Sequence, residues 1–371
     1  MPHVDDLLSA VLPPIRVLDF GRQAALRSQA VYHGVAEAMS ADGSPVLCLV
    51  TPQHPYVCIG AHQAVEQEVD EAYCAAQGLP VIRRHVGGGA VYLDENQLFF
   101  HFVYPEQPGM LPVSRLYTKF IEPVLRTYRR FGVEATMRPI NDIHVHGRKI
   151  GGTGAATIGE AMVMVGSFLF DFDAEHMSHC LQVSSEKFRD KLYNNLRDYI
   201  TSFRRELGDA APEQSAVKAV FLEEVAATLD VQPLRDEPTA REWAAIAEWE
   251  DRLNDPEWTY RQGRRFRAGQ VKIAAGTHLT ESSHKAPGGL IRVRMLVRDD
   301  CIADLELSGD FTCLPESGVE NLAKGLLGAS LDPASLQDHL SAVLKDLQLD
   351  MPGVTLEDLW TVLRCAAEPP A

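Results

Sequence analysis

The sequence predicts an α+β fold with a mixed, mainly antiparallel sheet, flanking helices, and a second, small α+β domain at the C-terminal end. Short apolar runs typical of strands alternate irregularly with helical periodicity, without the regular repeat of a βαβ protein. A polar and aromatic stretch, broken by Pro256 and Gly263, precedes the last hundred of the 371 residues. We therefore expect two domains, at residues 1–260 and 270–371.

The first third of the chain contains a helix and a set of strands that flank a run of glycines. Helical periodicity over 22–45 ends at Asp42-Gly43, and the apolar runs "PVLCLVT" and "YVCIG" follow as short strands. A second helix ends near Gly78. Strand character then appears in "PVIRR" and in "AVYLDENQLFFHFVYP", on either side of the glycines at 87–89.

The middle of the chain predicts a hairpin between helices. A long helix ends at Gly132, and "DIHVHGRKIGG" alternates on both sides of a Gly147-Arg148 turn. The apolar run "AMVMVGSFLFDFD" predicts a further strand, and helices dominate 174–253. In the C-terminal part, "VKIAAG", "LIRVRMLV" and "CIADLELSG" predict three strands, with a turn at Asp299-Asp300, and three helices follow.

Composition and charge exclude several classes of function. The net charge of −16 argues against a binder of nucleic acid or of membrane surfaces. The chain has no apolar stretch of the roughly 18 residues that a membrane span needs, and its beginning lacks the apolar core of a signal peptide. Its seven cysteines form no CxxC pair, which favours a reducing compartment. We expect a cytoplasmic protein.

The glycine run lies between two arginines and an apolar strand. Gly87, Gly88 and Gly89 would weaken a strand pair, but they allow another group to approach the backbone closely. Successive main-chain N–H groups in such a turn can bind an anion, and Arg83 and Arg84 could add phosphate contacts. The spacing matches neither the Walker nor the Rossmann pattern. A charged, glycine-rich hairpin is the alternative.

A second glycine-rich segment, 141–156, carries a lysine just after its turn. Lys149, aimed at a carboxylate and a nucleotide, could stabilise the negative charge that develops at a reacting carbonyl. Asn141 and Asp142 carry the oxygen ligands that Mg²⁺ prefers, so Asp142 is a candidate metal ligand. His144 and His146 lack an evident third ligand for a metal. A charged hairpin without a ligand is again the alternative.

Taken together, "RRHVGGGAVYLD" and "NDIHVHGRKIGG" resemble the lipoate–protein ligase branch of the biotin/lipoate ligase superfamily. "YVCIGAHQ", "VGSFLFDFD" and "EDRLNDPEWTYRQGRRF" resemble the surrounding segments in the same order, and the last hundred residues resemble the accessory domain of these ligases. The resemblance implies a fold like that of class II aminoacyl-tRNA synthetases. The chain departs from the family at Leu93, where a histidine is usual, and at Gly151-Gly152-Thr153-Gly154, where Ser-Gly-Ser-Ala is usual.

The resemblance implies an enzyme that uses ATP, Mg²⁺ and lipoate to form lipoyl-AMP and pyrophosphate. The lipoyl group then passes to a lysine of an acceptor, which could be an E2 lipoyl domain, an H protein or a related lipoate-binding protein. By the same resemblance Lys149 is catalytic, Val91 and Ile150 line an apolar slot for the acyl chain, and the enzyme is a monomer. The residues implied at the substrate or ATP are Arg83, Arg84, His85, Gly87, Gly88, Gly89, Ala90, Val91, Asn141, Asp142, Ile150, Gly152 and Thr153.

Three alternatives remain open. An octanoyl or lipoyl transferase of the same superfamily exchanges thioesters through a cysteine without ATP, but "EATMRPINDIHV", where one branch has that cysteine, contains none. A biotin ligase has a different glycine loop. A non-catalytic lipoate-binding homologue would not need Lys149 beside both glycine-rich segments.

Overall fold

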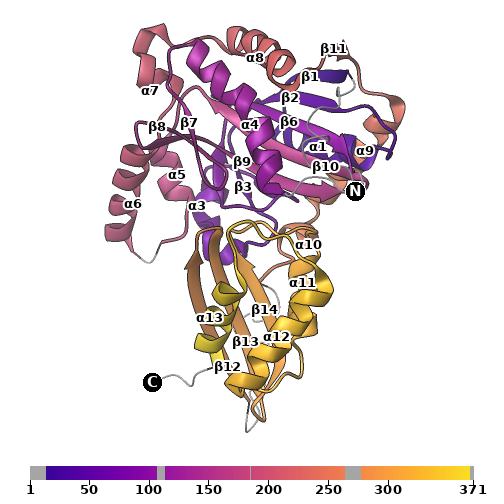
Figure 1. Ribbon diagram of the computed structural model, residues 1–371. Coiled ribbons are helices and arrows are strands. Elements are labelled where there is room, and N and C mark those ends of the chain that lie inside the picture. The colour runs from indigo at the N-terminus through magenta and orange to yellow at the C-terminus, as the bar shows by residue number, and fades with distance from the viewer. Residues whose placement is uncertain (1–13, 107–112, 184, 264–276, 368–371) are drawn as a thin grey trace.

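The computed structural model describes residues 14–106, 113–183, 185–263 and 277–367. They form a large part built on an eight-stranded sheet and a small part built on a three-stranded sheet (Figure 1). Separate hydrophobic cores lie between each of these two sheets and its helices. The core of the small part consists of residues between 286 and 366. These cores support the proposal that the chain comprises two domains.

The eight-stranded sheet is mixed and mainly antiparallel, as the sequence predicted. The first strand, β1, is parallel to both of its neighbours, β11 and β2, whereas all other neighbouring strands are antiparallel. In spatial order the strands are β11 (Pro233–Asp236), β1 (Ile15–Gln23), β2 (Val46–Pro52), β6 (Gln97–Pro105), β10 (Ala161–Leu169), β9 (Arg148–Ile158), β8 (Asp142–Val145) and β7 (Thr136–Arg138).

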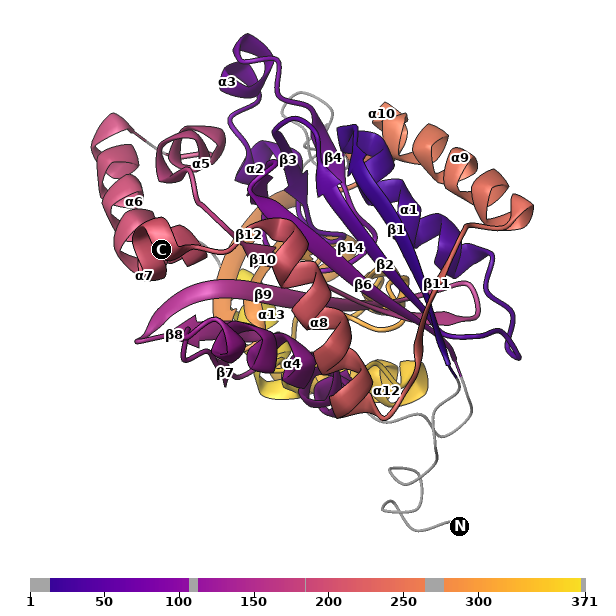
Figure 2. The same ribbon diagram turned by 90° about the horizontal axis from the view of Figure 1, so that it is seen from above.

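Helices cover both faces of this sheet (Figure 2). One face packs against α4 (Val113–Arg130) and α8 (Gln214–Leu229), and the other against α1 (Ala25–Glu37) and α9 (Ala240–Asn254). The central strand β6 is buried along its whole length, because its alternate residues serve the two cores: Phe100 faces the α4 side and Phe99 faces the α1 side.

A second sheet, of three short strands, carries the glycine run. Its central strand β3 (Tyr56–Ile59) pairs with β4 (Val81–Arg83) on one edge and β5 (Val91–Leu93) on the other. The glycines at 87–89 therefore connect the two edges of a sheet, and the hairpin interpretation is wrong because β4 and β5 do not pair with each other.

The strand character predicted after the glycines is divided between two strands, β5 and β6. The chain turns between β5 and β6, where the main-chain N–H of Asn96 donates to Asp94 Oδ1 at 2.9 Å, and then enters the other sheet. The predicted helical region 174–253 also contains β11, a strand too short to show a period of its own. The remaining elements of the large part are α2 (Val65–Glu68), α3 (Glu71–Ala76), α5 (Ala174–Cys180), α6 (Glu186–Tyr199), α7 (Phe203–Leu207), the 3₁₀ helix η1 (Gly208–Ala210) and α10 (Pro256–Thr259).

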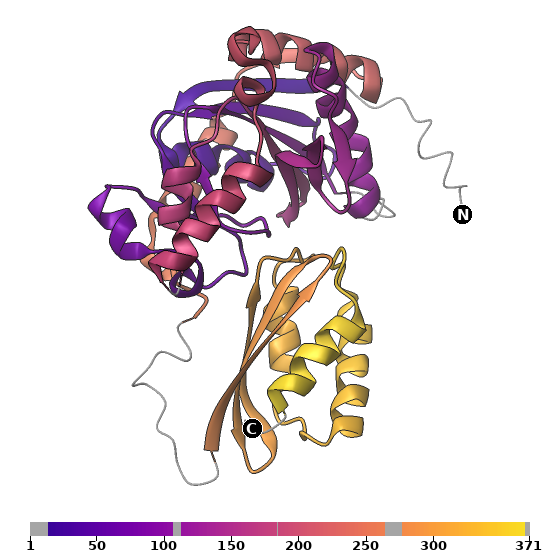
Figure 3. The ribbon, with the colours of Figure 1, turned by 90° about the vertical axis from the view of Figure 1, so that its left-hand side faces the viewer.

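The small part is an antiparallel three-stranded sheet covered on one face by three helices (Figure 3). Its strands are β12 (Thr277–Ala286), β13 (Gly289–Arg298) and β14 (Cys301–Gly309), and its helices are α11 (Gly318–Gly325), α12 (Pro333–Leu347) and α13 (Leu356–Ala367). The turn at Asp299 and Asp300, both with positive φ, joins β13 and β14 as predicted. The predicted strand "VKIAAG" lies outside the described residues, and the largely polar β12 was missed. Nowhere in the described ranges is a helix both long and apolar enough to span a bilayer.

Buried histidines should make the fold sensitive to acid. Burial lowers the pKa of His62 and that of His101 from 6.5 to about 3, so the unfolded chain takes up a proton near pH 6.5 that the folded chain does not. The stabilisation is therefore complete above that pH and decreases as the pH falls. We expect the free energy of unfolding to drop, below about pH 6, by about 1.4 kcal/mol per pH unit for each histidine.

Urea unfolding measured at a series of pH values tests this expectation. The His62→Phe variant keeps a ring to pack against Phe311. Below about pH 6, its free energy of unfolding should change with pH less steeply than that of wild type, by the contribution of one histidine. The exposed His278, changed to Gln, is the control and should leave the slope unchanged. Equal slopes for wild type and His62→Phe would contradict the assignment.

Candidate functional site

The sheet brings the two glycine-rich segments into direct contact. Gly154 on β9 lies against the glycine loop: a Cβ at Gly154 would be 2.6 Å from Val86 Cγ1 and 3.9 Å from the Gly87 carbonyl oxygen. Only glycine allows this approach, because any side chain there would displace the loop. The pairing of these segments, which the sequence suggested, is thus present in space.

Lys149 extends from the start of β9 onto the face that carries the glycine loop. The β8–β9 turn has positive φ at His146 and Gly147, as a tight hairpin requires. Lys149 Nζ lies 2.7 Å from Asp142 Oδ1, and a Cβ at Gly152 would be 3.1 Å from the same amine. The lysine side chain is 35% exposed. A positive charge is therefore held in place, beside backbone without side chains, and remains reachable from solvent.

Asn141 and Thr153 fasten the two strands of this hairpin to each other. The Asn141 amide donates to the Thr153 carbonyl, and the Thr153 N–H donates back to the Asn141 carbonyl at 2.9 Å. The Thr153 hydroxyl donates to the same carbonyl at 3.1 Å. These bonds fix the register that places the carboxylate of Asp142 beside Lys149.

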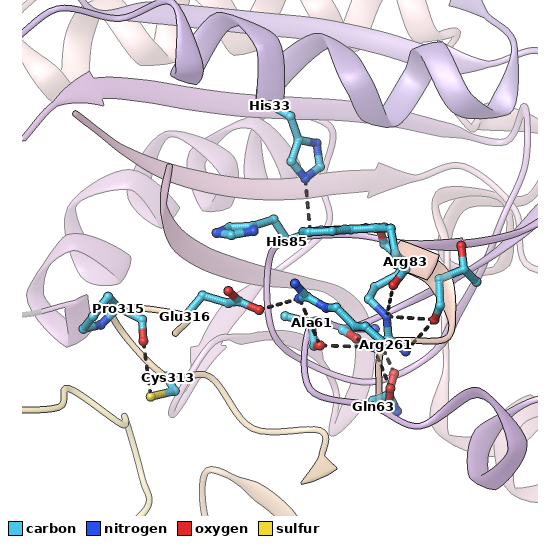
Figure 4. Close-up of polar contacts among 12 residues, drawn as sticks. His33, Ala61, Gln63, Arg83, His85, Arg261, Cys313, Pro315 and Glu316 are labelled. Carbon is cyan, nitrogen blue, oxygen red and sulfur yellow. Dashed lines mark hydrogen bonds and ion pairs between the residues drawn. The ribbon is translucent and has the colours of Figure 1, made fainter. Parts of the chain in front are cut away.

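The Arg83 side chain, expected at a phosphate, is fully buried (Figure 4). Its guanidinium makes six hydrogen bonds of 2.6–3.2 Å to five main-chain carbonyls, those of Gly60, Ala61, Gln63, Trp258 and Thr259. Burial, with a smaller effect of Arg261, lowers the pKa of Arg83 to about 9. All three nitrogens of the side chain are thus engaged with the protein, and we propose that Arg83 supports the site without touching a ligand.

Arg84 shapes the glycine loop from inside. Its Nη2 donates to the carbonyls of Gly87 at 2.8 Å and Gly89 at 2.9 Å, while Nη1 donates to the Cys58 carbonyl at 3.3 Å. Gly88, between the two bonded glycines, has a φ of 93°, which favours glycine. The arginine therefore fixes the loop conformation in this structure.

Four other predicted residues lie around the site and not at its centre. The main-chain N–H of His85 donates to His33 Nε2 at 3.1 Å (Figure 4). The His85 ring stacks on that of Trp258. Burial lowers the pKa of His85 and keeps the ring neutral. Ile150 is buried in the core on the α4 side, so it does not line a slot beside the glycine loop; Val91 is 37% exposed, and Ala90 is partly buried.

The small part covers part of the glycine loop, a contact that the sequence did not predict. The Gly88 N–H donates to the Phe311 carbonyl at 3.4 Å, and a Cβ at Gly87 would be 2.6 Å from the same oxygen. The Gly309 N–H donates to the His62 carbonyl at 2.9 Å. The contact joins residues more than two hundred positions apart, so no local sequence pattern could predict it.

An ion pair and a cavity lie at the same boundary between the two parts. Arg261 pairs with Glu316 of the small part, beside a cavity of about 250 Å³ whose lining includes His62 and Glu320. The charged lining differs from the apolar surroundings that an acyl chain needs. The cavity therefore belongs to the contact between the parts and does not resemble an acyl pocket.

The described residues contain no group of three His, Cys, Asp or Glu side chains arranged to hold a metal ion. The Asp142 carboxylate is a hard oxygen ligand beside Lys149, and the side-chain oxygen of Asn141 adjoins it in sequence. One carboxylate, completed by substrate phosphates, is a donor set that suits Mg²⁺. Asp142 and Asn141 are therefore suited to a Mg²⁺ ion that binds together with the nucleotide.

Comparisons with known proteins agree with this arrangement. The family "Lipoyl protein ligase A/B catalytic domain" matches residues 25–226, and "Bacterial lipoate protein ligase C-terminus" matches residues 277–363. The chain is 27% identical over 307 residues to lipoate-protein ligase LplJ of Bacillus subtilis (82% of this chain, 86% of the relative). It is also 27% identical over 271 residues to octanoyltransferase LipM of Kyrpidia tusciae (67% of this chain, 98% of the relative).

Solved structures share the fold. LipL1 of P. falciparum, in complex with lipoate, is similar with a TM-score of 0.66 at 16% identity and covers 95% of this chain and 98% of its own. A bipartite lipoate protein ligase of Thermoplasma acidophilum, described with its E2 lipoyl domain, gives a TM-score of 0.61 at 23% identity and covers 71% of this chain and 99% of its own.

The supporting role of Arg83 predicts a loss of stability on substitution. Arg83→Lys replaces a planar fork by a single ammonium, which cannot reach five carbonyls, and should lower the free energy of unfolding by about 3 kcal/mol. Urea unfolding measures the change. The exposed Arg129, changed to Lys, is the control and should alter stability by less than about 0.5 kcal/mol. Full stability of Arg83→Lys together with loss of ligand binding would contradict the assignment.

Proposed function

Because the chain belongs to the lipoyl protein ligase A/B family, we propose that it activates lipoate with ATP as lipoyl-AMP and transfers the lipoyl group to a lysine of an acceptor protein. The observation that carries this proposal is the Lys149 amine, held by Asp142 over Gly152 on the face that carries the glycine loop. Lipoate and ATP are both anionic and must come together to react. A fixed positive charge at Lys149, next to the open backbone at Gly152, would attract both of them.

In the first step an oxygen of the lipoate carboxylate attacks the α-phosphorus of ATP. A bond between that oxygen and phosphorus forms, the bond to the bridging oxygen breaks, and pyrophosphate leaves. Lys149 draws the two like-charged reactants together and stabilises the additional negative charge on the α-phosphate oxygens. Its attachment to Asp142 fixes the amine before the substrates arrive, so little reorganisation is needed.

Asp142, with the side-chain oxygen of Asn141, would hold Mg²⁺ at the phosphates. When bound, the ion neutralises phosphate charge and improves pyrophosphate as a leaving group. The glycines at 87–89, which Phe311 covers in part in this structure, would present their backbone to the nucleotide and acyl group, and Arg84 keeps the loop in shape.

In the second step the amine of an acceptor lysine attacks the acyl carbon of lipoyl-AMP. A carbon–nitrogen bond forms, the bond to the AMP oxygen breaks, and the amine loses a proton. Lys149 stabilises the oxyanion on the former carbonyl oxygen. The acceptor is an E2 lipoyl domain, an H protein or a related lipoate-binding protein; the similar T. acidophilum ligase is described together with an E2 lipoyl domain. We propose that the enzyme acts as a monomer in the cytoplasm.

A thioester-exchanging transferase is the second candidate, because the chain is similar to an octanoyltransferase. That chemistry needs a cysteine thiolate. Cys58 adjoins the glycine loop, with its Sγ 3.8 Å from Arg84 Nη1, but the thiol is completely buried and burial raises its pKa. Such a thiol is a poor nucleophile near neutral pH, which favours the ATP-dependent route.

Pyrophosphate release separates these candidates. With purified protein, ATP and Mg²⁺, we expect pyrophosphate only when free lipoate or octanoate is added, and an acyl mass gain on a lipoyl domain when it is added as well. Modification of the acceptor from an octanoyl thioester without ATP would support the transferase. A mass gain only with biotin would overturn both.

Removal of the Lys149 amine should abolish activation. Lys149→Ala loses the charge that stabilises the transition state, and we expect adenylate formation to fall by about 10²–10³-fold while lipoate binding changes only a few-fold. Lys218→Ala is the matched control, because Lys218 also contacts a carboxylate at 2.7 Å, that of Asp19, away from the site. Equal activity of the two variants would contradict the role of Lys149.

A further inference from the structure

A row of paired residues leads across the main sheet from the glycine loop. Gly154 on β9 pairs with Val165 on β10, and Val165 pairs with His101 on β6. Directly paired residues in an antiparallel sheet share a face, and Gly154 shows that this face carries the glycine loop. Two strand spacings separate Gly154 from His101, a distance of about 10 Å.

The row ends in a buried aromatic group. The ring of Tyr32, on α1, stacks on that of His101 with centroids 4.5 Å apart, and Phe99 meets the same imidazole edge-on at 6.0 Å. Tyr32 is 1% exposed and His101 is 3% exposed. Helix α1 packs on β2, β6, β9 and β10 (Figure 2). The low exposure of Tyr32 and His101 places this aromatic group away from solvent.

Two polar atoms of this group have no hydrogen-bond partner among the described residues: the Tyr32 hydroxyl and His101 Nδ1. The neighbouring Tyr56 differs, since its hydroxyl is 2.9 Å from Ser28 Oγ and accepts from Gln29 at 2.7 Å. Burial raises the pKa of Tyr32, so its O–H remains a donor, and it lowers the pKa of His101 to about 3, so the imidazole is neutral. An unpaired buried hydroxyl is unfavourable unless something else pairs with it.

We propose that the Tyr32 hydroxyl recognises the dithiolane ring of lipoate at the far end of the acyl site. The inference rests on the proposed function, since it concerns the tail of the substrate whose carboxylate lies at Lys149. Disulfide sulfurs are polarisable, pack well on aromatic rings and accept weak hydrogen bonds. Tyr32, His101 and Phe99 supply three rings and one free donor for such a group.

An unbranched acyl chain of the same length would use this end poorly. Its terminal methyl group cannot accept a hydrogen bond, so the Tyr32 hydroxyl would stay unpaired. The site should therefore prefer lipoate to octanoate. Entry of either chain requires Val86, which covers Gly154, to move, and the adjacent glycines give the loop the freedom to do so.

Direct binding of the free acids tests the proposal without ATP. Dissociation constants of wild type for lipoate and octanoate, measured by calorimetry, should differ in favour of lipoate. Tyr32→Phe keeps the stacked ring and removes only the oxygen, so lipoate should bind about three- to tenfold more weakly while octanoate binds as before or more tightly.

Tyr104→Phe is the matched control. The Tyr104 hydroxyl is also buried without a partner in the described parts of the chain, but its ring belongs to the core on the α4 side of the sheet. This variant should leave the ratio of the two dissociation constants unchanged. Urea unfolding of both variants checks that each remains folded.

The outcomes separate this inference from the proposed function. Tyr32-dependent preference for lipoate, without pyrophosphate release, would support the inference and defeat the proposed ligase activity. Pyrophosphate release with equal effects of Tyr32→Phe on both acids would overturn the inference alone, as would an equal change in Tyr104→Phe. Failure of wild type to bind either acid would overturn both.

Discussion

The buried guanidinium of Arg83 is the interaction on which the site depends. It joins the end of β4 to the loop after β3, at Gly60, Ala61 and Gln63, and to the segment around Trp258 that ends the large part. The indole N–H of Trp258 donates back to the Arg83 carbonyl at 2.9 Å. Because β4 leads directly into the glycine loop, this cluster fixes the base from which the loop extends.

A buried cation is stable here because carbonyl dipoles surround it. Removal of a charge from water is costly, and five main-chain oxygens replace the lost hydration of the guanidinium without placing a carboxylate beside it. The carbonyls of Gly60 and Trp258 also accept the main-chain N–H groups of Gln63 and Arg261, so the arginine shares these oxygens with the backbone. The neighbouring Arg84 likewise donates to main-chain carbonyls, those of Gly87 and Gly89 in the loop itself.

The sequence predicted the fold class and the pairing of the two glycine-rich segments, because strand character, turn residues and basic side chains are local properties of the chain. Lys149 and Asp142 adjoin as a hairpin of that register requires. Residue type did not reveal burial, however: Arg83 and Arg84 carry the same charge, and only the fold shows that both bond to carbonyls. The contact of Phe311 with Gly87 could not be predicted because it joins distant segments of the chain. Strand β12 was missed because most of its exposed residues are polar.

The hydrogen bonds that a side chain already makes within the protein indicate whether it supports the site or is available to bind a ligand. Arg83 is fully buried and each of its three nitrogens bonds to a main-chain carbonyl, so it has little to offer a ligand. Tyr32 is equally buried, yet its hydroxyl has no partner in the described parts of the chain, and Lys149 is held by one carboxylate and open to solvent. The Tyr32 hydroxyl and the Lys149 amine both belong to the side of the main sheet that carries the glycine loop. A substrate with an anionic head and a polarisable tail could meet both, and we therefore expect lipoate to suit this site better than a plain fatty acid does.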